Sequence, residues 1–321
     1  MILSRRMAGA ALLSLVVAAR SAKAQAYPSK MVKIVVPTGP GGITDIVARI
    51  VASRLSERMG QTFLVDNKGG AGGIIGTEVV ARAPPDGYTL LMVYPSHPVN
   101  PGLKLHLPYD TIRDFAPVTT LTTVSLVLVV PPSLPARSVQ ELIALSKRDR
   151  LTFASVGSGS LAHLGAELFR VKAGIELTHV PYRSAPAAQQ ALMGGEVSMF
   201  FDTPITSVPL VKDGRLRALG VSTRTRSDLL PDVLTIEEAG VPGYEVLGWN
   251  GILAPAATPA PIVQRLNGEI CAVLDEPEIK QKLAQQGADP APTDPESFGR
   301  LIRDDVAKWT EVIRGAGIQP D

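Results

Sequence analysis

The chain has 321 residues, with 32 Lys and Arg against 30 Asp and Glu, and a formal net charge of +2 at pH 7. This balance gives no basic surface of the kind that binds nucleic acid, and the length favours two domains of ~100–200 residues each. A single cysteine, Cys271, excludes an internal disulfide, and the four histidines have no metal-binding spacing, so we expect neither a metal nor a cofactor.

The first 24 residues have the features of a secretory signal peptide. Arg5 and Arg6 precede the uncharged, mostly apolar run 10–19, and an A-x-A cleavage pattern follows at 22–24. Removal of this segment would take away four positive and no negative charges, so the formal net charge would fall from +2 to −2. The sequence therefore predicts export to the periplasm, by the ordinary secretory route or, given the paired arginines, by the twin-arginine route. No later segment has the ~18 uncharged apolar residues that a membrane-spanning helix needs.

The clearest local pattern lies between residues 32 and 59. Val32–Val36 is a mostly β-branched apolar run, typical of a strand that is buried on both faces. The loop 37–42 contains three glycines, and Thr44 or Asp45 is a good N-cap for the helix that follows. A glycine loop that leads into a helix start presents backbone N–H groups to an anion without any cationic side chain. The glycines can equally serve only the geometry of a tight turn, and the sequence leaves both interpretations open.

Strand-like and helix-like patterns alternate through the rest of the chain. The expected strands are 61–65, 89–94, 126–130, 151–154, 177–180, 197–201 and 216–221. The expected helices are 74–82, 138–147, 161–172, 186–193, 260–275, 277–286 and 295–314. Such repeated βα units predict an α/β fold with parallel sheets covered by helices, and ligands then bind in crevices beyond the carboxyl ends of the strands.

A second strand–loop–helix unit begins at residue 151. Its loop, S-V-G-S-G-S at 155–160, is rich in glycine and in hydroxyl groups, and Ser160 is a natural N-cap. Hydroxyl groups in such a loop can donate hydrogen bonds to a carboxylate. As an alternative, Ser158 or Ser160 would act as the nucleophile of a hydrolase with His163 as its base, although the G-x-S-x-G elbow of such enzymes is absent.

Two similar anion loops suggest two lobes that face each other across a cleft. The chain is expected to cross between the lobes near 126–130 and again near 245–253, where long apolar stretches occur. The first lobe would then comprise 27–124 together with 246–321, and the second lobe would comprise 125–245.

A series of motifs, too many in one order to arise by chance, identifies a relationship. In chain order they are Y-P-S-K-x-V-K-I-V-V-P (27–37), P-G-G-x-T-D (40–45), G-A-G-G-x-I-G (70–76), A-P-P-D-G-Y-T-L-L (83–91), L-P-Y-D (107–110), D-F-A-P-V (114–118), G-S-G-S-L-A-H-L-G-A-E-L-F (157–169), H-V-P-Y-R (179–183), L-M-G-G-E-V (192–197), G-R-L-R-A-L (214–219), L-P-D-V (230–233) and W-N-G-I-L-A-P (249–255). Through them the chain resembles the substrate-binding proteins of the tripartite tricarboxylate transporter family, the Bug receptors, from residue 27 to about residue 313.

The resemblance implies a type II periplasmic-binding-protein fold, in which two lobes with mainly parallel sheets close over a ligand cleft. It implies a monomeric extracytoplasmic receptor, not an enzyme, that captures a small carboxylate: a di- or tricarboxylate, an amino acid or an aromatic acid. The expected partner is a tripartite tricarboxylate-type permease in the membrane. A receptor that presents its ligand to a membrane sensor, and the serine hydrolase above, are the alternatives.

Carried over by position, the resemblance implies that the ligand carboxylate is held by backbone amides, hydroxyls and waters of the two loops. The first loop supplies Thr38, Gly39, Gly41, Gly42, Thr44 and Asp45, and the second supplies Ser155, Gly157, Ser158 and Ser160. One departure matters for the ligand. Family members usually have an aromatic residue where this chain has Thr38, so a small hydroxyl group replaces an apolar wall of the pocket. The ligands of relatives are therefore a poor guide to the ligand of this chain.

Five further residues follow predicted strand ends and are candidates for the cleft. They are Ser96, Asn100, Tyr182, Arg183 and Asp202. Each has a simpler alternative role: Ser96, Asn100 and Asp202 can cap turns, and Arg183 can be a solvated surface residue. If Asp202 faces the cleft, its carboxylate would repel an acid that offers no hydrogen-bond donor such as an ammonium or a hydroxyl.

Overall fold

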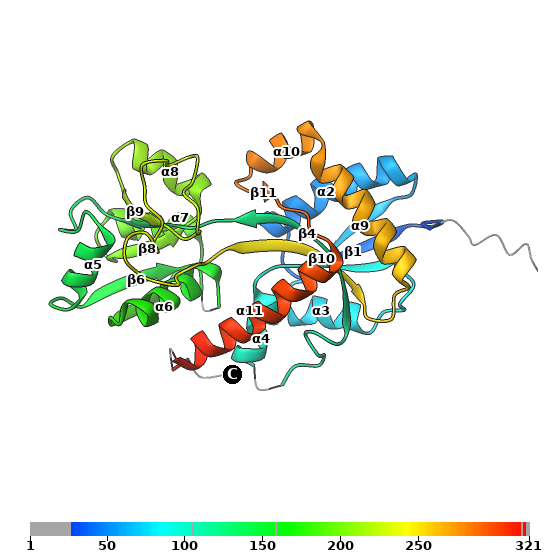
Figure 1. Ribbon diagram of the computed structural model, residues 1–321, viewed down its shortest axis with the longest axis horizontal. Helices are drawn as coiled ribbons and strands as arrows, with labels where there is room; N and C mark the ends of the chain where they lie inside the picture. The colour runs from blue at the N-terminus through cyan, green and yellow to red at the C-terminus, as the bar shows by residue number, and fades with distance from the viewer. Residues whose placement is uncertain (1–26, 105, 158, 316, 319–321) are drawn as a thin grey trace, which may run out of the picture.

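The computed structural model describes residues 27–104, 106–157, 159–315 and 317–318. Two β-sheets lie side by side, each covered by helices, and the long strands β4 and β10 run from one toward the other (Figure 1). We call the six-stranded sheet with its helices the first lobe and the five-stranded sheet with its helices the second lobe. The predicted signal peptide lies outside the described residues. Within them, no helix is both long enough and apolar enough to cross a bilayer.

The sheet of the first lobe has the strand order β11-β4-β10-β3-β1-β2. Its strands are β1 (Val32–Val36), β2 (Phe63–Asn67), β3 (Thr89–Val93), β4 (Phe115–Val124), β10 (Gly248–Pro255) and β11 (Asp289–Pro290). One face is covered by α2 (Ile43–Met59), α9 (Ala260–Asp275) and α10 (Pro277–Ala284). The other is covered by α3 (Ile74–Ala81) and α11 (Pro295–Gly315), with α4 (Ser96–Leu103) packed against α11 and a short 3₁₀ turn, η1 (Ala71–Gly73), before α3.

The sheet of the second lobe has the strand order β7-β6-β8-β5-β9. Its strands are β5 (Val127–Val130), β6 (Leu151–Ser155), β7 (Leu177–Pro181), β8 (Met199–Asp202) and β9 (Arg217–Val221). Its helices are α5 (Val139–Ser146), α6 (Leu161–Ala173), α7 (Ala185–Met193) and α8 (Pro204–Lys212). Each of the strands β6, β7 and β8 leads directly into a helix, so the starts of α6, α7 and α8 gather at one edge of the sheet.

The apolar run of β1 is buried on both faces, as its composition predicts. Val32, Ile34 and Val36 pack into the cluster formed with α2 and α9, while Val35 points to the opposite cluster with α3 and α11. Because side chains alternate across a strand, only a continuous apolar run can fill both clusters. Each such buried side chain contributes about 1.5–3 kcal/mol of hydrophobic stabilisation. The first anion loop is therefore fixed to a rigid strand.

The α/β fold with two lobes is confirmed, but the expectation of mainly parallel sheets needs a correction. β1, β2 and β3 pair in parallel, and so do β6, β7 and β8. β10 pairs antiparallel with β3 and β4, and β5 pairs antiparallel with β8 and β9. These antiparallel strands flank the points where the chain passes from one sheet to the other. There the chain enters a sheet directly, without the helical crossover that makes neighbouring strands parallel.

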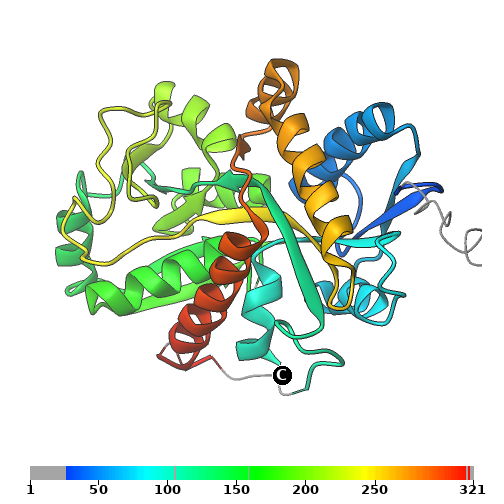
Figure 2. The same ribbon diagram turned by 45° about the vertical axis from the view of Figure 1, so that its right-hand side comes forward.

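The C-terminal helix α11 packs against both lobes. Its first half places Phe298 and Ile302 in a core cluster of the first lobe, and its second half places Trp309 and Ile313 in the core cluster of the second lobe. Figure 2 shows the helix running beside α6 of the second lobe. The exact division of the chain predicted from the sequence therefore stays a proposal, because α11 is shared between the lobes.

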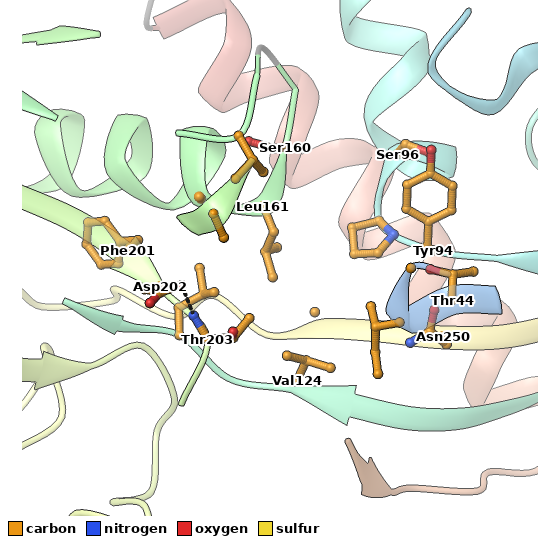
Figure 3. A pocket seen from close by; sticks show the side chains of 18 of the residues that line it. Thr44, Tyr94, Ser96, Val124, Ser160, Leu161, Phe201, Asp202, Thr203 and Asn250 are labelled. Atoms are coloured by element: carbon orange, nitrogen blue, oxygen red, sulfur yellow. Dashed lines mark hydrogen bonds between the residues drawn. The ribbon is translucent and has the colours of Figure 1, made fainter. Parts of the chain in front are cut away.

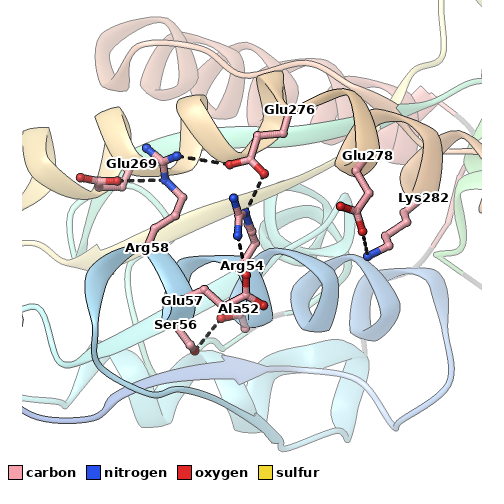
Figure 4. A network of polar contacts seen from close by, with 9 residues as sticks. All are labelled: Ala52, Arg54, Ser56, Glu57, Arg58, Glu269, Glu276, Glu278 and Lys282. Carbon is pink, nitrogen blue, oxygen red and sulfur yellow. Dashed lines mark hydrogen bonds and ion pairs between the residues drawn. The ribbon is translucent and has the colours of Figure 1, made fainter.

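Ion pairs fasten α2 to the segment between α9 and α10 (Figure 4). Arg54 Nε lies 2.6 Å from one carboxylate oxygen of Glu276, and Arg58 NH1 lies 3.2 Å from the other. Arg58 Nε also pairs with Glu269 at 3.2 Å. Partly exposed pairs of this kind contribute about 0–1 kcal/mol each. They orient α2, whose other end reaches the site described next.

Candidate functional site

A cavity of about 360 Å³ lies between the two lobes (Figure 3). The first lobe lines it with Thr38, Gly42, Ile43, Thr44, Tyr94, Pro95, Ser96, Val124, Gly248, Trp249 and Asn250. Across the cavity lie Leu126, Val156, Gly159, Ser160, Leu161, Ala162, Ala185, Phe200, Phe201, Asp202 and Thr203. The starts of α2, α4, α6, α7 and α8 all contribute, because each follows the carboxyl end of a strand. This is the crevice that the alternation of strands and helices predicts.

The start of α2 presents backbone N–H groups to the cavity. The N-cap residue is Gly42, which has no side chain that could cap the helix. The first backbone hydrogen bond of α2 runs from Ile46 N to the Gly42 carbonyl oxygen. Helix geometry therefore leaves the N–H groups of Ile43 and Thr44 without an intrahelical acceptor. Both residues line the cavity. An anion placed there meets two donors and the positive end of a 17-residue helix.

Asp45 supports this loop from behind and does not line the cavity. Its side chain is buried and accepts hydrogen bonds from Gly41 N at 2.9 Å, from Arg49 Nε at 3.1 Å and from Asn67 Nδ2 at 2.9 Å. Burial alone would raise the pKa of this carboxyl group, but these bonds and the Arg49 charge hold the pKa below its usual value. Gly39 and Gly41 also lie off the cavity wall, so Thr38, Gly42 and Thr44 are the first-loop candidates that face it.

The second loop is held by bonds among its own residues. Gly157 N donates to Ser155 Oγ at 3.0 Å, and the Ser160 hydroxyl donates to the Gly157 carbonyl at 2.7 Å. Gly159 N donates to His163 Nδ1 at 3.1 Å. Ser160 lines the cavity, whereas the hydroxyl of Ser155 is turned into the lobe, and Ser158 lies outside the described residues.

Two histidines support the second loop from within the lobe. Ser155 Oγ and His179 Nε2 share a hydrogen bond of 2.6 Å, and the ring of His179 stacks on that of His163 with centroids 4.2 Å apart. Burial lowers the pKa of both imidazoles to about 4, so both rings are neutral at pH 7. The bond that joins His163 to Ser160 runs from the His163 backbone N–H. The ring Nδ1 accepts from Gly159 N, so Ser160 and His163 do not form a nucleophile–base pair, and Ser155, the serine that bonds a histidine ring, is fully buried.

Asp202 lies at the end of β8, on the cavity wall but only 2% exposed. One carboxylate oxygen accepts from Thr203 N at 2.8 Å and the other from Gln189 Nε2 at 2.5 Å, while the Thr206 hydroxyl lies 3.0 Å from both. Burial raises the pKa of Asp202, and these hydrogen bonds offset part of that rise. The carboxylate thus holds Thr203, the N-cap residue of α8, by the bond drawn in Figure 3.

The structure brings residues to the cavity that sequence patterns did not identify. Leu161, Phe200 and Trp249 are apolar residues of regular elements, and nothing in their local sequence marks them as cavity residues. Asn250 donates from Nδ2 to Thr122 Oγ1 at 3.2 Å, and its Oδ1 has no partner among the described residues. The place of Asn250 within W-N-G of β10, in a stretch singled out as a lobe crossing, was the available signal.

The remaining sequence candidates do not line this cavity. Asn100 donates to the Gly72 carbonyl at 3.1 Å and borders an adjoining cavity of about 540 Å³, which shares Ser96 and Ser160 with the first. Tyr182 and Arg183 lie at the surface beyond β7 and border neither cavity.

The charges around the cavity are unusual for an anion site. Among the described residues that line it, none is Lys, Arg or His, and Asp202 is the single carboxylic acid. The positive potential therefore comes from helix starts and backbone N–H groups. Such a site can bind and orient a small anion. In the described part of the chain, no group of three or more His, Cys, Asp or Glu side chains is placed to hold a metal ion.

Comparison of the sequence with known proteins gives matches along almost the whole chain. A family model described as the tripartite tricarboxylate transporter family receptor matches residues 47–318. A protein of Pseudomonas sp. (strain P51), named the UPF0065 protein in the tcbD-tcbE intergenic region, is 39% identical over 312 residues. That alignment covers 96% of this chain and 93% of the relative.

Two solved structures are similar in both sequence and fold. R. palustris Rpa4515 with adipate is 38% identical, with a TM-score of 0.78 over 92% of this chain and 100% of that chain. MatC (Rpa3494) from Rhodopseudomonas palustris with bound malate is 31% identical, with a TM-score of 0.74 over 89% of this chain and 100% of that chain. The likeness therefore covers both lobes and the cavity between them.

Proposed function

This chain belongs to the tripartite tricarboxylate transporter family of receptors, and from that premise we propose that it captures a small carboxylate between its lobes and delivers it to a tripartite tricarboxylate-type membrane permease. The proteins of this family are solute-binding receptors and not enzymes, and the same holds for this chain. The bonding of Ser160 and His163 agrees with this, since the His163 ring accepts from Gly159 and not from the serine hydroxyl.

The observation that carries the proposal is the uncapped start of α2 in the wall of a cavity that both lobes share. Ile43 and Thr44, whose N–H groups have no intrahelical acceptor, line this cavity, and none of the described residues that line it is Lys, Arg or His. Adipate and malate, the acids bound by two structural neighbours, are small carboxylates, and an uncapped helix start can hold one carboxylate group of such an acid. An acid held at α2 and touched by the second lobe would favour the closed arrangement of the lobes.

Export belongs to the same proposal. The pattern of charge, apolar run and A-x-A at 1–24 supports cleavage near residue 25, and delivery to a permease requires a receptor outside the cytoplasm. In the native host, fractionation should find a protein that begins at or next to Gln25 in the periplasm. Full-length chain that begins at Met1 in the cytoplasmic fraction would contradict this part.

Native mass spectrometry of protein purified from its host without dialysis tests the binding function. We expect a complex whose excess mass equals one small organic acid, released unchanged when the protein is denatured. Calorimetric titration with the released acid should then give saturable binding at one site. If no acid co-purifies, and a panel containing acetate, benzoate, phenylacetate, malate, adipate and citrate gives no saturable binding, the proposed function is wrong.

A further inference from the structure

We propose that the ligand is a monocarboxylate with an apolar body, such as an aryl-substituted or branched short-chain acid, and not a di- or tricarboxylate. This inference rests on the proposed function and narrows its substrate class. It differs from the acids in the two neighbouring structures, and three features of this chain support it: the number of open anion sites, the chemistry of the walls and the charge on the second lobe.

Among the described residues, the helix starts around the cavity differ in how many of their backbone N–H groups already have a hydrogen-bond acceptor. α2 has no side-chain cap, so its first N–H groups are open to a ligand. α8 has no side-chain cap either, but its first residue is Pro204, which has no N–H group, and Thr206 N already donates to the Thr203 carbonyl at 3.2 Å. α6 is capped by the Ser160 hydroxyl, which accepts from His163 N at 3.3 Å. α4 also lacks a side-chain cap, but it has only eight residues and His97 N already donates to the Tyr94 carbonyl at 2.9 Å. A ligand carboxylate is therefore best accommodated at the 17-residue helix α2.

The second loop has few N–H groups to offer to a second carboxylate. The N–H groups of Gly157 and Gly159 donate to Ser155 Oγ and His163 Nδ1, and Ser160 N donates to the Gly157 carbonyl at 3.3 Å. All three bonds lie inside the loop and the helix that follows it. The loop would have to give up these bonds, at some cost, to bind an anion as α2 can.

The wall opposite the start of α2 is apolar. Leu161, Phe200, Phe201 and Leu126 come from the second lobe, and Val124 and Trp249, at the ends of β4 and β10 nearest that lobe, add to the apolar surface. Figure 3 shows the side chain of Leu161 extending toward the cavity, across from Tyr94 and Thr44. A second carboxylate against such a wall would lose its hydration without gaining a partner, whereas a ring or branched chain would gain contact.

The one acid on the cavity wall adds to this preference. Asp202 has no described cation among its bonded partners, which are Gln189, Thr203 and Thr206. A ligand carboxylate near the second lobe would be repelled by it, and the low polarity of the surroundings would leave that repulsion poorly screened. A cavity of about 360 Å³ also has room for a ring-bearing acid, being within the range of ordinary small-molecule sites.

Calorimetric titration with phenylacetate and adipate tests the proposal, because the two acids are similar in size and differ in the second charge. We expect phenylacetate to bind at least about tenfold more tightly, and phenylacetamide, which lacks the charge, to bind far more weakly than either. Leu161→Lys would place a cation in the apolar wall and should reverse the preference toward adipate. Val171→Lys, on the exposed surface of the same helix, is the matched control and should leave the ranking unchanged.

The outcomes separate this inference from the proposed function. Tighter binding of adipate, malate or citrate than of every apolar monocarboxylate would overturn the inference and leave carboxylate capture intact. An unchanged ranking in Leu161→Lys, provided that the variant unfolds at the temperature of the wild type, would also overturn it. Absence of saturable binding by any acid would instead contradict the proposed function itself.

Discussion

Gly159 of the second lobe and Leu103 at the end of α4 touch across the mouth of the cavity. A β-carbon added to Gly159 would lie 2.9 Å from Leu103 Cδ1, closer than real side chains approach. The backbone of Gly159 has a φ of +76°, so glycine is favoured there twice, by conformation and by space. The contact lies where α4 of the first lobe meets the second lobe, beside the adjoining cavity that Ser96 and Ser160 also border.

Gly159→Ala should therefore weaken ligand binding by about three- to tenfold, because Leu103 has to move before the lobes can close on the added methyl group. Gly195→Ala is a matched control: its φ is +77°, and nothing lies within 4 Å of the added carbon. Both changes should lower the stability of the unliganded protein by a similar ~1–2 kcal/mol, from the left-handed backbone alone. Calorimetry and thermal unfolding separate the two effects.

A second variant keeps this prediction testable. Leu103→Ala in the Gly159→Ala background should restore much of the affinity, because it removes the atom that the new methyl group meets. Equal affinity for the wild type and Gly159→Ala would show that the contact has no part in closure.

The start of α2 allows one hydrogen-bond donor to be removed at a residue, Ile43, whose side chain is only partly buried against the core of the first lobe. Ile43 is the first helical residue after the N-cap, a position at which proline is well tolerated because its missing N–H has no intrahelical partner. Ile43→Pro should reduce carboxylate affinity by about tenfold or more while leaving the unfolding temperature within a few degrees.

Ile43→Val is the matched control for that change. It keeps the N–H group and alters the cavity wall by a single methylene, so the affinity should stay within about threefold of wild type. Titration of both variants with the same acid measures the contribution of the N–H group. Similar affinities in the two variants would show that the ligand carboxylate does not bind at the start of α2.

His179 gives a pH-dependent prediction. Burial, followed by the neighbouring His163, lowers its pKa to about 4, and Glu167 opposes this only in part. The unfolded ring has a pKa of about 6.5, so the neutral folded form contributes stability above that pH and loses it as the pH falls from 6.5 toward 4. With a discount for its partial exposure, the contribution of His179 should be about 1–2 kcal/mol between pH 7 and pH 4.5.

Two substitutions at this position separate titration from hydrogen bonding. His179→Gln can keep the bond to Ser155 and does not titrate, so it should be close to wild type at pH 7 and lose less stability on acidification. His179→Leu also loses the bond and should be less stable at pH 7 by about 0.5–1.5 kcal/mol. Urea unfolding at pH 7 and pH 4.5 checks both. An acid sensitivity in His179→Gln equal to that of wild type would contradict the assignment.

The strand, loop and helix around the first anion site were predictable because each is encoded locally. β1 is a short apolar run, and α2 follows a loop rich in glycine. Other elements escaped prediction for physical reasons. β4 includes the run T-T-L-T-T, and its buried Thr119 and Thr120 are accommodated by hydrogen bonds to residues near Thr293, some 170 positions away. α4 contains Pro101, which argues against a helix when only local pattern is available.

The residues of the candidate site also fall into those that the sequence could identify and those that it could not. The loops that carry Gly42, Thr44 and Ser160 could be identified because glycine and N-cap residues mark strand ends. The apolar wall could not, because the side of a strand that Phe200 or Trp249 faces depends on its register with strands distant in the sequence. Asp45 was expected to contact the ligand, but its carboxylate accepts hydrogen bonds from Gly41 and Asn67. The sequence could not separate these roles, because an acid in the first turn of a helix can bond either to the preceding loop or to a ligand.

An acid that binds between the lobes should hold them closed, and small-angle X-ray scattering measures this closure directly. The radius of gyration should be measured for the protein freed of ligand and again at saturation with the acid that binds most tightly by calorimetry. We predict a smaller radius with the acid, because a ligand that touches both lobes binds the closed arrangement more tightly and shifts the population toward it. A radius that stays the same at saturation would contradict the claim.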